Sequence, residues 1–339
     1  MIIVMKIDEL LTQKDVLFIT TKNLSYIRNV QEISLIKSYA KTYHIIGSNS
    51  SKYIFRLISI VAQLLRADRN KYSVCFVGFA PQLILPFIRK KLKNKLVIQD
   101  FFISLYDTFC LDRQKFSPNS WIGKLLHKLD AATLSLSDYI ITDTKIHGKF
   151  FVEEFNADTT KLITLYLDAS HITSRFPHLT NQKESTFDPF KVLYFGSILP
   201  LQGIEVILEA AKLLKAEHNI HFEIIGPLKA KHKKICSANS NITLINWLEE
   251  EALYEHIRKA DLCLAGHFSS SIDKAQRTIP GKAFIYQAFN IPMILGDTPA
   301  NHEIFCEDNR FIYFVPTGDP SALASKIKTL STQDASSPF

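Results

Sequence analysis

The stretch "KVLYFGSILPLQGIEVILEAAKLL", Lys191 to Leu214, decides the fold class. Its opening run, Lys191–Ser197, is short and almost continuously apolar, which predicts a strand buried on both faces. A turn ending at Gly203 follows, and the amphipathic pattern from Ile204 to Glu217 predicts a helix. Strand, turn and helix in this order form one repeat of a parallel α/β sheet.

The same alternation runs through the rest of the chain. Further strands are expected at Asp15–Thr20, Tyr43–Ser48, Ser73–Phe79, Lys95–Phe101, Asp138–Asp143, Leu162–Leu167, His221–Gly226, Ile242–Trp247, Asp261–Gly266, Pro292–Asp297 and Phe311–Pro316. Helices are expected near residues 29–41, 53–67, 123–136, 145–155, 250–260 and 320–330, and another after the loop 277–282. Between the two halves, Ala169–Phe190 is polar, contains two prolines and has no sustained period, which is typical of a linker.

We therefore expect an α/β protein with two Rossmann-like, doubly wound domains that face a cleft. The domains are predicted at residues 1–170 and 191–330, with a linker at 171–190 and a tail at 331–339. The length of 339 residues fits two domains. The five cysteines include no Cys-x-x-Cys pair, which favours reduced thiols and a cytoplasmic protein.

Net charge is +7, and much of it is local. Ile88–Lys95 contains five basic residues and directly follows the apolar residues Leu83–Ile88. Two interpretations of the segment Leu83 to Lys95 are open. The segment lies on the inner face of an anionic membrane, or it is a solvated helix end whose apolar side joins the core. A nucleic-acid partner is not expected, because no recognisable binding module accompanies the charge. The longest apolar stretch, Tyr53–Leu65, contains Arg56 and is too short to span a bilayer.

Glycines and polar residues follow the predicted strands of the second half, where such folds bind ligands. They are Gly196 and Ser197, Gly226, Asn246 and Trp247, Gly266 and His267, and Gly296 and Asp297. The loop "RTIPGK" adds two cations, Arg277 and Lys282, just before a helix. Cations and free backbone N–H groups at a strand end are typical of a phosphate site.

The order of these motifs resembles the GT-B glycosyltransferases, in particular the retaining family four, also called glycosyl transferases group 1. The resemblance covers most of the chain and is strongest from Lys191 to Phe305. "DKAQRTIPGK" (Asp273–Lys282) looks like one branch of these relatives, and in the first half "QDFFISLYDTFCLDR" (Gln99–Arg113) and "SDYIITDTKIHGKFF" (Ser137–Phe151) are similar to them.

Four positions depart from the common pattern of that family. Its first loop carries an arginine and a lysine where this chain has Ser197 and Gln202. Its two motif glutamates correspond here to Arg277 and Ile285. Two cations and two carboxylates of the usual donor pocket are therefore absent, and Arg277 and Lys282 are the cations that remain.

The resemblance implies transfer of a sugar from a nucleotide-diphosphate sugar to a glycan or lipid-linked acceptor, with retention and without a metal or other cofactor. We expect Lys282 and Arg277 to clamp the diphosphate, helped by the backbone at Gly196 and Ser197. The other residues expected at the donor are Gln202, Gly203, Trp247, Thr278, Ile279 and Glu303, the last as a candidate ribose contact. Asp100 is a candidate catalytic carboxylate, and Asp107, Arg113 and Arg28 are candidate acceptor contacts.

Two rival functions remain open at this stage. The loss of both motif glutamates is compatible with a non-catalytic, transferase-like binding or assembly subunit. A nucleotide-sugar epimerase on the same fold is the other alternative.

Overall fold

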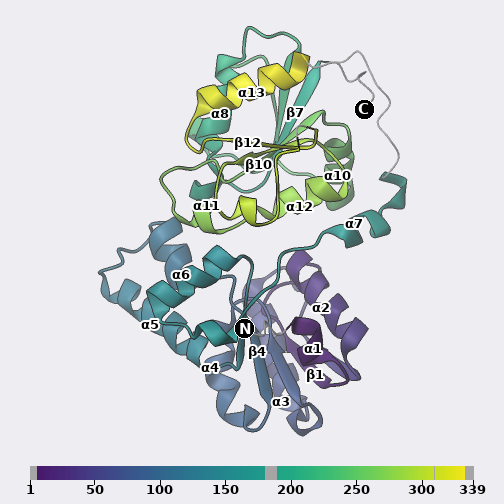
Figure 1. The fold of residues 1–339 in the computed structure, drawn as a ribbon, viewed down its shortest axis with the longest axis vertical. Helices are drawn as coiled ribbons and strands as arrows, with labels where there is room; N and C mark the ends of the chain where they lie inside the picture. Colours follow the sequence, from purple (N-terminus) through teal and green to yellow (C-terminus); the bar gives the residue numbers. More distant parts are fainter. Residues whose placement is uncertain (1–5, 180–188, 309, 333–339) are drawn as a thin grey trace. The chain divides into compact units, whose positions relative to one another are not determined.

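A computed structural model of the protein describes residues 6–179, 189–308 and 310–332. The chain divides into two compact units, Met1–Asp168 and Ala169–Phe339. Each unit is built on a six-stranded sheet in which every pairing between strands is parallel. Helices cover both faces of each sheet (Figure 1). The prediction of an α/β protein with two doubly wound units is confirmed.

The first sheet has the strand order β2-β1-β3-β4-β5-β6. Its strands are β1 Asp15–Ile19, β2 Thr42–Ile46, β3 Val74–Val77, β4 Leu96–Asp100, β5 Tyr139–Thr142 and β6 Leu162–Thr164. The helices of this unit are α1 Ile7–Leu11, α2 Ile27–Tyr39, α3 Tyr53–Arg66, α4 Leu85–Ile88, α5 Trp121–Ser135 and α6 Lys145–Phe155. Helix α1 was not predicted, because it is too short to show a helical period.

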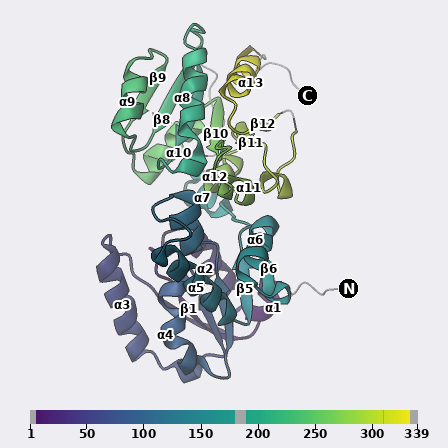
Figure 2. The ribbon, with the colours of Figure 1, turned by 90° about the vertical axis from the view of Figure 1, so that its left-hand side faces the viewer.

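Alternate residues of β1 are buried on opposite faces of this sheet. On one face, Leu17 and Ile19 pack with Ile60 and Leu64 of α3. On the other, Val16 and Phe18 pack with residues of α1 and α2. Figure 2 shows α3 and α4 in the lower part of the view, at the margin of the first unit.

The segment Leu83–Lys95 joins the core rather than presenting an apolar face to solvent. It forms α4 and the 3-10 turn Arg89–Leu92, and its apolar side chains at 84, 85, 88 and 92 are buried. Only Phe87 among its large apolar side chains is exposed, at 78%. The basic residues of this segment thus surround the end of a core-packed helix. In the described part of the chain, no helix has the length and apolarity required to cross a membrane.

A buried ion cluster links α2 to the ends of β4 and β6. The Arg28 guanidinium donates to the Asp100 carboxylate from Nε at 2.7 Å and also to the carbonyl of Leu165. Arg28, Glu32 and Asp100 are all buried, and Glu32 lies 3.9 Å from the Arg28 Nε. Burial, followed by the charge of Asp100, raises the pKa of the Glu32 carboxyl well above its usual range. One cation therefore serves two buried carboxyl groups.

The second sheet has the order β12-β11-β10-β7-β8-β9. Its strands are β7 Phe190–Phe195, β8 Ile220–Ile225, β9 Ile242–Ile245, β10 Leu262–Gly266, β11 Met293–Gly296 and β12 Ile312–Val315. The helices are α7 Ser170–Arg175, α8 Ile204–Leu213, α9 Ala230–Ser237, α10 Glu250–Arg258, α11 Lys274–Arg277, α12 Gly281–Ala288 and α13 Pro320–Thr332. Counted from β7, this is the order of the dinucleotide-binding Rossmann fold.

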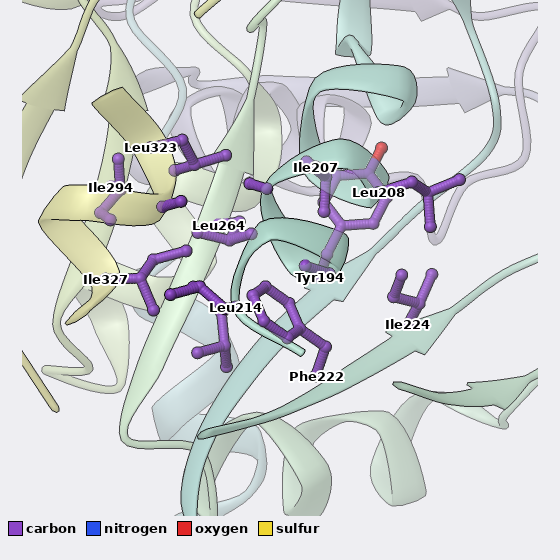
Figure 3. Close-up of a cluster of buried hydrophobic side chains, with 14 of the residues drawn as sticks. Tyr194, Ile207, Leu208, Leu214, Phe222, Ile224, Leu264, Ile294, Leu323 and Ile327 are labelled. Carbon is purple, nitrogen blue, oxygen red and sulfur yellow. The ribbon is translucent and has the colours of Figure 1, made fainter. Parts of the chain in front are cut away.

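The core of the second unit lies between this sheet and the helices α8 and α13. Tyr194 and Phe222 come from neighbouring strands, Ile207 and Leu208 from α8, and Leu323 from α13 (Figure 3). All are at most about 1% exposed. The apolar strand that opened the sequence analysis is therefore the centre of this core.

Part of the segment assigned to a linker, 171–190, is ordered against the second unit. Its first residues form α7, and Phe176 packs edge-on against Tyr254 of α10, with ring centroids 5.4 Å apart. Arg175 forms an ion pair with Glu250 at 2.8 Å. Residues 180–188 of this segment and residues 333–339 of the expected tail lie outside the described residues.

We predict that Arg28→Leu destabilises the protein by about 3–5 kcal/mol, because it leaves Asp100 and Glu32 buried without a cation. Asp100→Asn should cost less, since Glu32 remains within reach of Arg28. Urea unfolding of both variants measures this, with the exposed Arg66→Leu as control. If Arg28→Leu lowers the free energy of unfolding no more than the control does, the cluster does not stabilise the fold.

Candidate functional site

The strand order of the second unit reverses between β7 and β10. From β7 the chain proceeds outward through β8 and β9, then returns to add β10, β11 and β12 on the other side of β7. Loops that leave β7 and β10 therefore turn toward opposite faces of the sheet and leave space between them. In open α/β sheets, ligands bind at this switch point, beyond the carboxyl ends of the strands.

Lys282 reaches this switch point from the first turn of α12. Its side chain is 8% exposed, and its Nζ donates a hydrogen bond of 2.7 Å to Oε1 of Gln202. The same Nζ lies 4.0 Å from the ring centroid of Tyr194, the last-but-one residue of β7. A loop residue, a helix residue and a strand residue thus converge on one point.

Two glycines are required for this convergence. A Cβ at Gly196, directly after β7, would lie 3.1 Å from the Lys282 Nζ. A Cβ at Gly266, at the end of β10, would lie 2.2 Å from Oε1 of Gln202, and its φ of +88° also disfavours other residues. Any side chain at Gly266 would therefore displace Gln202 from Lys282.

In the described part of the chain, Lys282 has no carboxylate partner, and the hydrogen-bond acceptor of its Nζ is Gln202, which is neutral. Burial lowers the pKa of the Lys282 amine well below its usual value. The buried Tyr194 hydroxyl, close to the same point, also has no hydrogen-bond partner among the described residues. A buried ammonium with unused donors, at the start of a helix, attracts an anion.

The loop before α12 is held by backbone and side-chain hydrogen bonds. The His267 ring, next to Gly266, bonds the carbonyl of Thr278 through Nδ1 at 2.8 Å. The Thr278 hydroxyl donates to the carbonyl of Lys274 at 2.9 Å. Both Thr278 and His267 are buried. These contacts fix the direction in which α12 starts, and so the position of Lys282. His267 was not among the residues singled out as donor contacts.

The remaining predicted donor residues lie at different distances from the switch point. Gly203 adopts a left-handed conformation just before α8, and Ser197 is exposed in the same loop. Arg277 ends α11 and is half-buried, as is Ile279. Trp247 follows the edge strand β9, and Glu303 lies in a turn after β11. β9 and β11 each stand two strands from β7, or about 10 Å across the sheet.

A pocket of about 430 Å³ opens beside this site, at the start of α8. It shares Gly203 with the loop described above and is also lined by Leu199, Glu205, Lys229 and Ser269. Lys282 is not part of its lining. The sequence analysis did not identify this pocket, because the residues that line it come from four separate loops and helices.

The candidate residues of the first unit fall into two groups. Asp100 and Arg28 are buried and bonded to each other. Asp107 and Arg113 lie in and just after a π-helical turn, Asp107–Asp112. Asp107 is buried, whereas Arg113 is exposed and lies over the Phe109 ring at 5.7 Å.

A histidine that the sequence analysis did not select lies beside Asp107. His147, in the first turn of α6, is buried, and its Nδ1 is 2.6 Å from the carboxylate of Asp143, which follows β5. Its Nε2 is 3.9 Å from Asp107. The signal in the sequence is the spacing of four between Asp143 and His147 at the end of a predicted strand, which places both on one face of a helix start.

Comparisons with known proteins agree with this architecture. The family model for glycosyl transferases group 1 matches residues 189–333. No curated protein sequence matches the chain. Among solved structures, sucrose-phosphate synthase from Thermosynechococcus elongatus superposes with a TM-score of 0.62 at 11% identity, covering 94% of this chain and 90% of that one.

Two further solved structures resemble the chain over most of its length. HepE from Anabaena, solved in complex with UDP and glucose, gives a TM-score of 0.59 at 10% identity and covers 95% of this chain and 90% of its own. A putative UDP-N-acetylglucosamine 2-epimerase from Listeria monocytogenes gives 0.55 at 12% identity, with coverage of 95% and 89%. At such identities these structures establish the fold.

The solved structures establish the GT-B fold, and residues 189–333 match the glycosyl transferases group 1 family. Together these findings support glycosyltransferase activity. The resemblance stated from the sequence is thereby confirmed. The roles of individual site residues stay predictions.

We predict that Gln202→Glu stabilises the protein and weakens its binding of nucleoside diphosphates. The new carboxylate would lie against the Lys282 ammonium, turning a neutral hydrogen bond into an ion pair that adds about 1–2 kcal/mol to the free energy of unfolding. The same carboxylate would occupy the place of a phosphate and repel the phosphate's negative charge. Thermal unfolding and calorimetric titration measure the two effects. Tighter nucleotide binding by this variant would contradict the assignment of the site.

Across the alkaline range, diphosphate affinity should fall as pH rises, and the fall should begin at a lower pH than for an exposed lysine, whose pKa is near 10.4. Burial lowers the pKa of the Lys282 amine, so the free protein loses this proton at a lower pH, whereas the bound anion favours the protonated amine. Binding then requires proton uptake, and affinity drops by up to about tenfold per pH unit. In Lys282→Met this dependence should be absent. A wild-type affinity that stays constant across the range would oppose the prediction.

Proposed function

We propose that the protein transfers a sugar from a nucleoside-diphosphate sugar to an acceptor hydroxyl, and that Lys282 binds the donor's diphosphate. The observation that carries this proposal is the buried Lys282 ammonium at the β7/β10 switch point, with a neutral residue as its hydrogen-bond partner. A diphosphate brings the negative charge that this site lacks. The family of residues 189–333 supports sugar transfer as the reaction.

In this reaction, the bond between the anomeric carbon and the β-phosphate oxygen breaks, and its electron pair leaves with the nucleoside diphosphate. The acceptor oxygen forms a bond to the same carbon, and its proton passes to an oxygen of the leaving phosphate. Negative charge grows on the leaving phosphate, and a fixed ammonium stabilises the transition state more than the ground state. Lys282 is in place before the reaction begins, because Gln202 and Tyr194 hold its side chain.

Other residues receive supporting roles in this proposal. The backbone at Gly196 and Ser197 donates to the phosphates, and Arg277 provides a second cation from the end of α11. Trp247 is exposed at 72% and offers a surface on which a base can stack, while Glu303 remains the candidate for the ribose. In the first unit, we assign acceptor contacts to Asp107 and Arg113, and a structural role to Arg28 and Asp100, which bind each other.

Several finer features of the reaction are part of the proposal. We infer retention of the anomeric configuration and independence from metals, since Lys282 supplies the charge that a divalent ion would otherwise supply. We infer that the acceptor is a glycan or a lipid-linked molecule. We also infer that the reaction belongs to polysaccharide or glycoconjugate synthesis at the cytoplasmic face of the membrane. Because the solved HepE structure contains UDP and glucose, a uridine diphosphate sugar is the first donor to test.

The experiment combines thermal shift with a transfer assay. At about 100 times its dissociation constant, a nucleoside diphosphate should add about 2.7 kcal/mol of stability, and Lys282→Met should abolish this shift. The same variant should lower the transfer rate by about 10²–10³-fold. Lys233→Met is the matched control, because Lys233 is exposed in α9 of the same unit. A chelator should leave the wild-type rate unchanged.

Other outcomes would replace the proposal by one of its rivals. A nucleotide-dependent shift without turnover on any sugar donor would favour a non-catalytic binding subunit. Epimerised free donor without transfer would favour an epimerase, whose fold is among the similar structures.

A further inference from the structure

The helix α3 carries its polar and apolar side chains in the reverse of the usual arrangement. Ile54, Ile58, Val61 and Leu65 repeat at intervals of four, three and four residues, so that they line one side of the helix. This side faces solvent: together with Tyr53 and Phe55, these residues are 41–70% exposed. No segment of the described chain covers them.

Two polar side chains of α3, Arg56 and Gln63, point toward the protein instead. Arg56 is buried, and its guanidinium donates to the carbonyl of Ser50 at 2.8 Å. The Gln63 amide donates to the carbonyl of Gly47 at 2.9 Å. The remaining inward positions, Ile60 and Leu64, are apolar and belong to the core. The outer side of α3 is apolar but faces solvent, and an apolar helix side of this kind belongs in an apolar environment.

The length of α3 determines whether it could cross a bilayer or only lie at its surface. Its 14 residues extend about 21 Å, less than the hydrocarbon thickness of about 30 Å. One side is also fixed to the sheet. The helix therefore cannot cross a bilayer, but it can lie in the interface with its outer side among the acyl chains.

The positive charge of the segments around α3 indicates that the surface it would contact is anionic. Residues 41–95 contain eleven lysines and arginines and a single acidic residue, Asp68, a net +10 in a chain whose total is +7. The exposed Lys90, Lys91 and Lys93 follow α4, whose Ile88 packs with Ile60 and Leu64 in one core cluster, so both segments cover the same face of the sheet. Figure 2 shows α3 at the outer edge of the first unit.

We propose that the outer side of α3 and the lysines after α4 form a docking surface for an anionic lipid bilayer. Apolar side chains enter the interface while the basic residues bind the headgroups. A nucleic acid would use the charge but not the aliphatic stripe, and a protein partner would not require so uniform a charge. The proposal does not depend on sugar transfer, since binding to lipid can be measured without a substrate.

Co-sedimentation with lipid vesicles tests this surface. The full chain should bind vesicles of phosphatidylcholine with phosphatidylglycerol, bind those of phosphatidylcholine alone far more weakly, and dissociate at high salt. Ile58→Gln/Leu65→Gln should lower the partition coefficient at least about tenfold, because each apolar side chain loses its burial. Lys90→Gln/Lys91→Gln should lower it about thirtyfold, and only on anionic vesicles.

The matched control is Leu125→Gln/Leu213→Gln, which removes equally exposed leucines from α5 and α8 and should bind as the wild type does. All variants should keep the wild-type melting temperature and nucleotide-induced shift, because the changed side chains are exposed and outside the donor site. Wild-type binding that Ile58→Gln/Leu65→Gln does not reduce would overturn the proposal. So would a soluble dimer that this variant dissociates without any vesicle binding, which would assign the surface to a second copy of the chain.

Discussion

The hydrogen bond between the Lys282 ammonium and Gln202 is the interaction on which the arrangement of the donor-side loops depends. It joins the start of α12 to the loop after β7, across 80 positions of sequence, at the place where the strand order of the second sheet reverses. The contact is possible only because Gly266 has no side chain and Gly196 leaves room for the ammonium. Burying this charge costs stability, and the diphosphate that we propose as its ligand would recover that cost.

This contact also explains one departure from the common family pattern. A lysine in place of Gln202 would bring a second ammonium against Lys282, at a position only 2.7 Å away. Two buried cations at that distance would repel each other strongly in the absence of ligand. The neutral Gln202 amide can therefore lie against the Lys282 ammonium without repulsion. The positive charge of the site comes from α12 rather than from the first loop.

The sequence predicted the fold well and the site in part. Continuous apolar runs and turn glycines located every strand to within a few residues, because burial on both faces leaves little choice of residue. Lys282, Gln202 and Gly196 were expected together, since all follow strands that meet at one edge of the sheet. The Tyr194 ring and the His267–Thr278 contact were missed, because each depends on how segments distant in sequence pack.

The pattern of the sequence did not determine which of these side chains are buried. Arg28 and Asp100 are 72 positions apart, and no local pattern indicates that they neutralise each other in the core. Of the two interpretations of Leu83–Lys95, the structure agrees with the one in which its apolar residues pack inward, whereas the stretch from Tyr53 to Leu65 exposes six of its apolar side chains. Both outcomes depend on which face of the sheet each segment covers, which periodicity alone does not determine.

A crystal structure of the protein with a nucleoside diphosphate would show where the diphosphate binds. We predict a β-phosphate oxygen about 3 Å from the Nζ of Lys282, replacing or sharing its contact with Gln202. A diphosphate bound elsewhere, such as in the pocket at the start of α8, with the Lys282–Gln202 hydrogen bond unchanged, would contradict it.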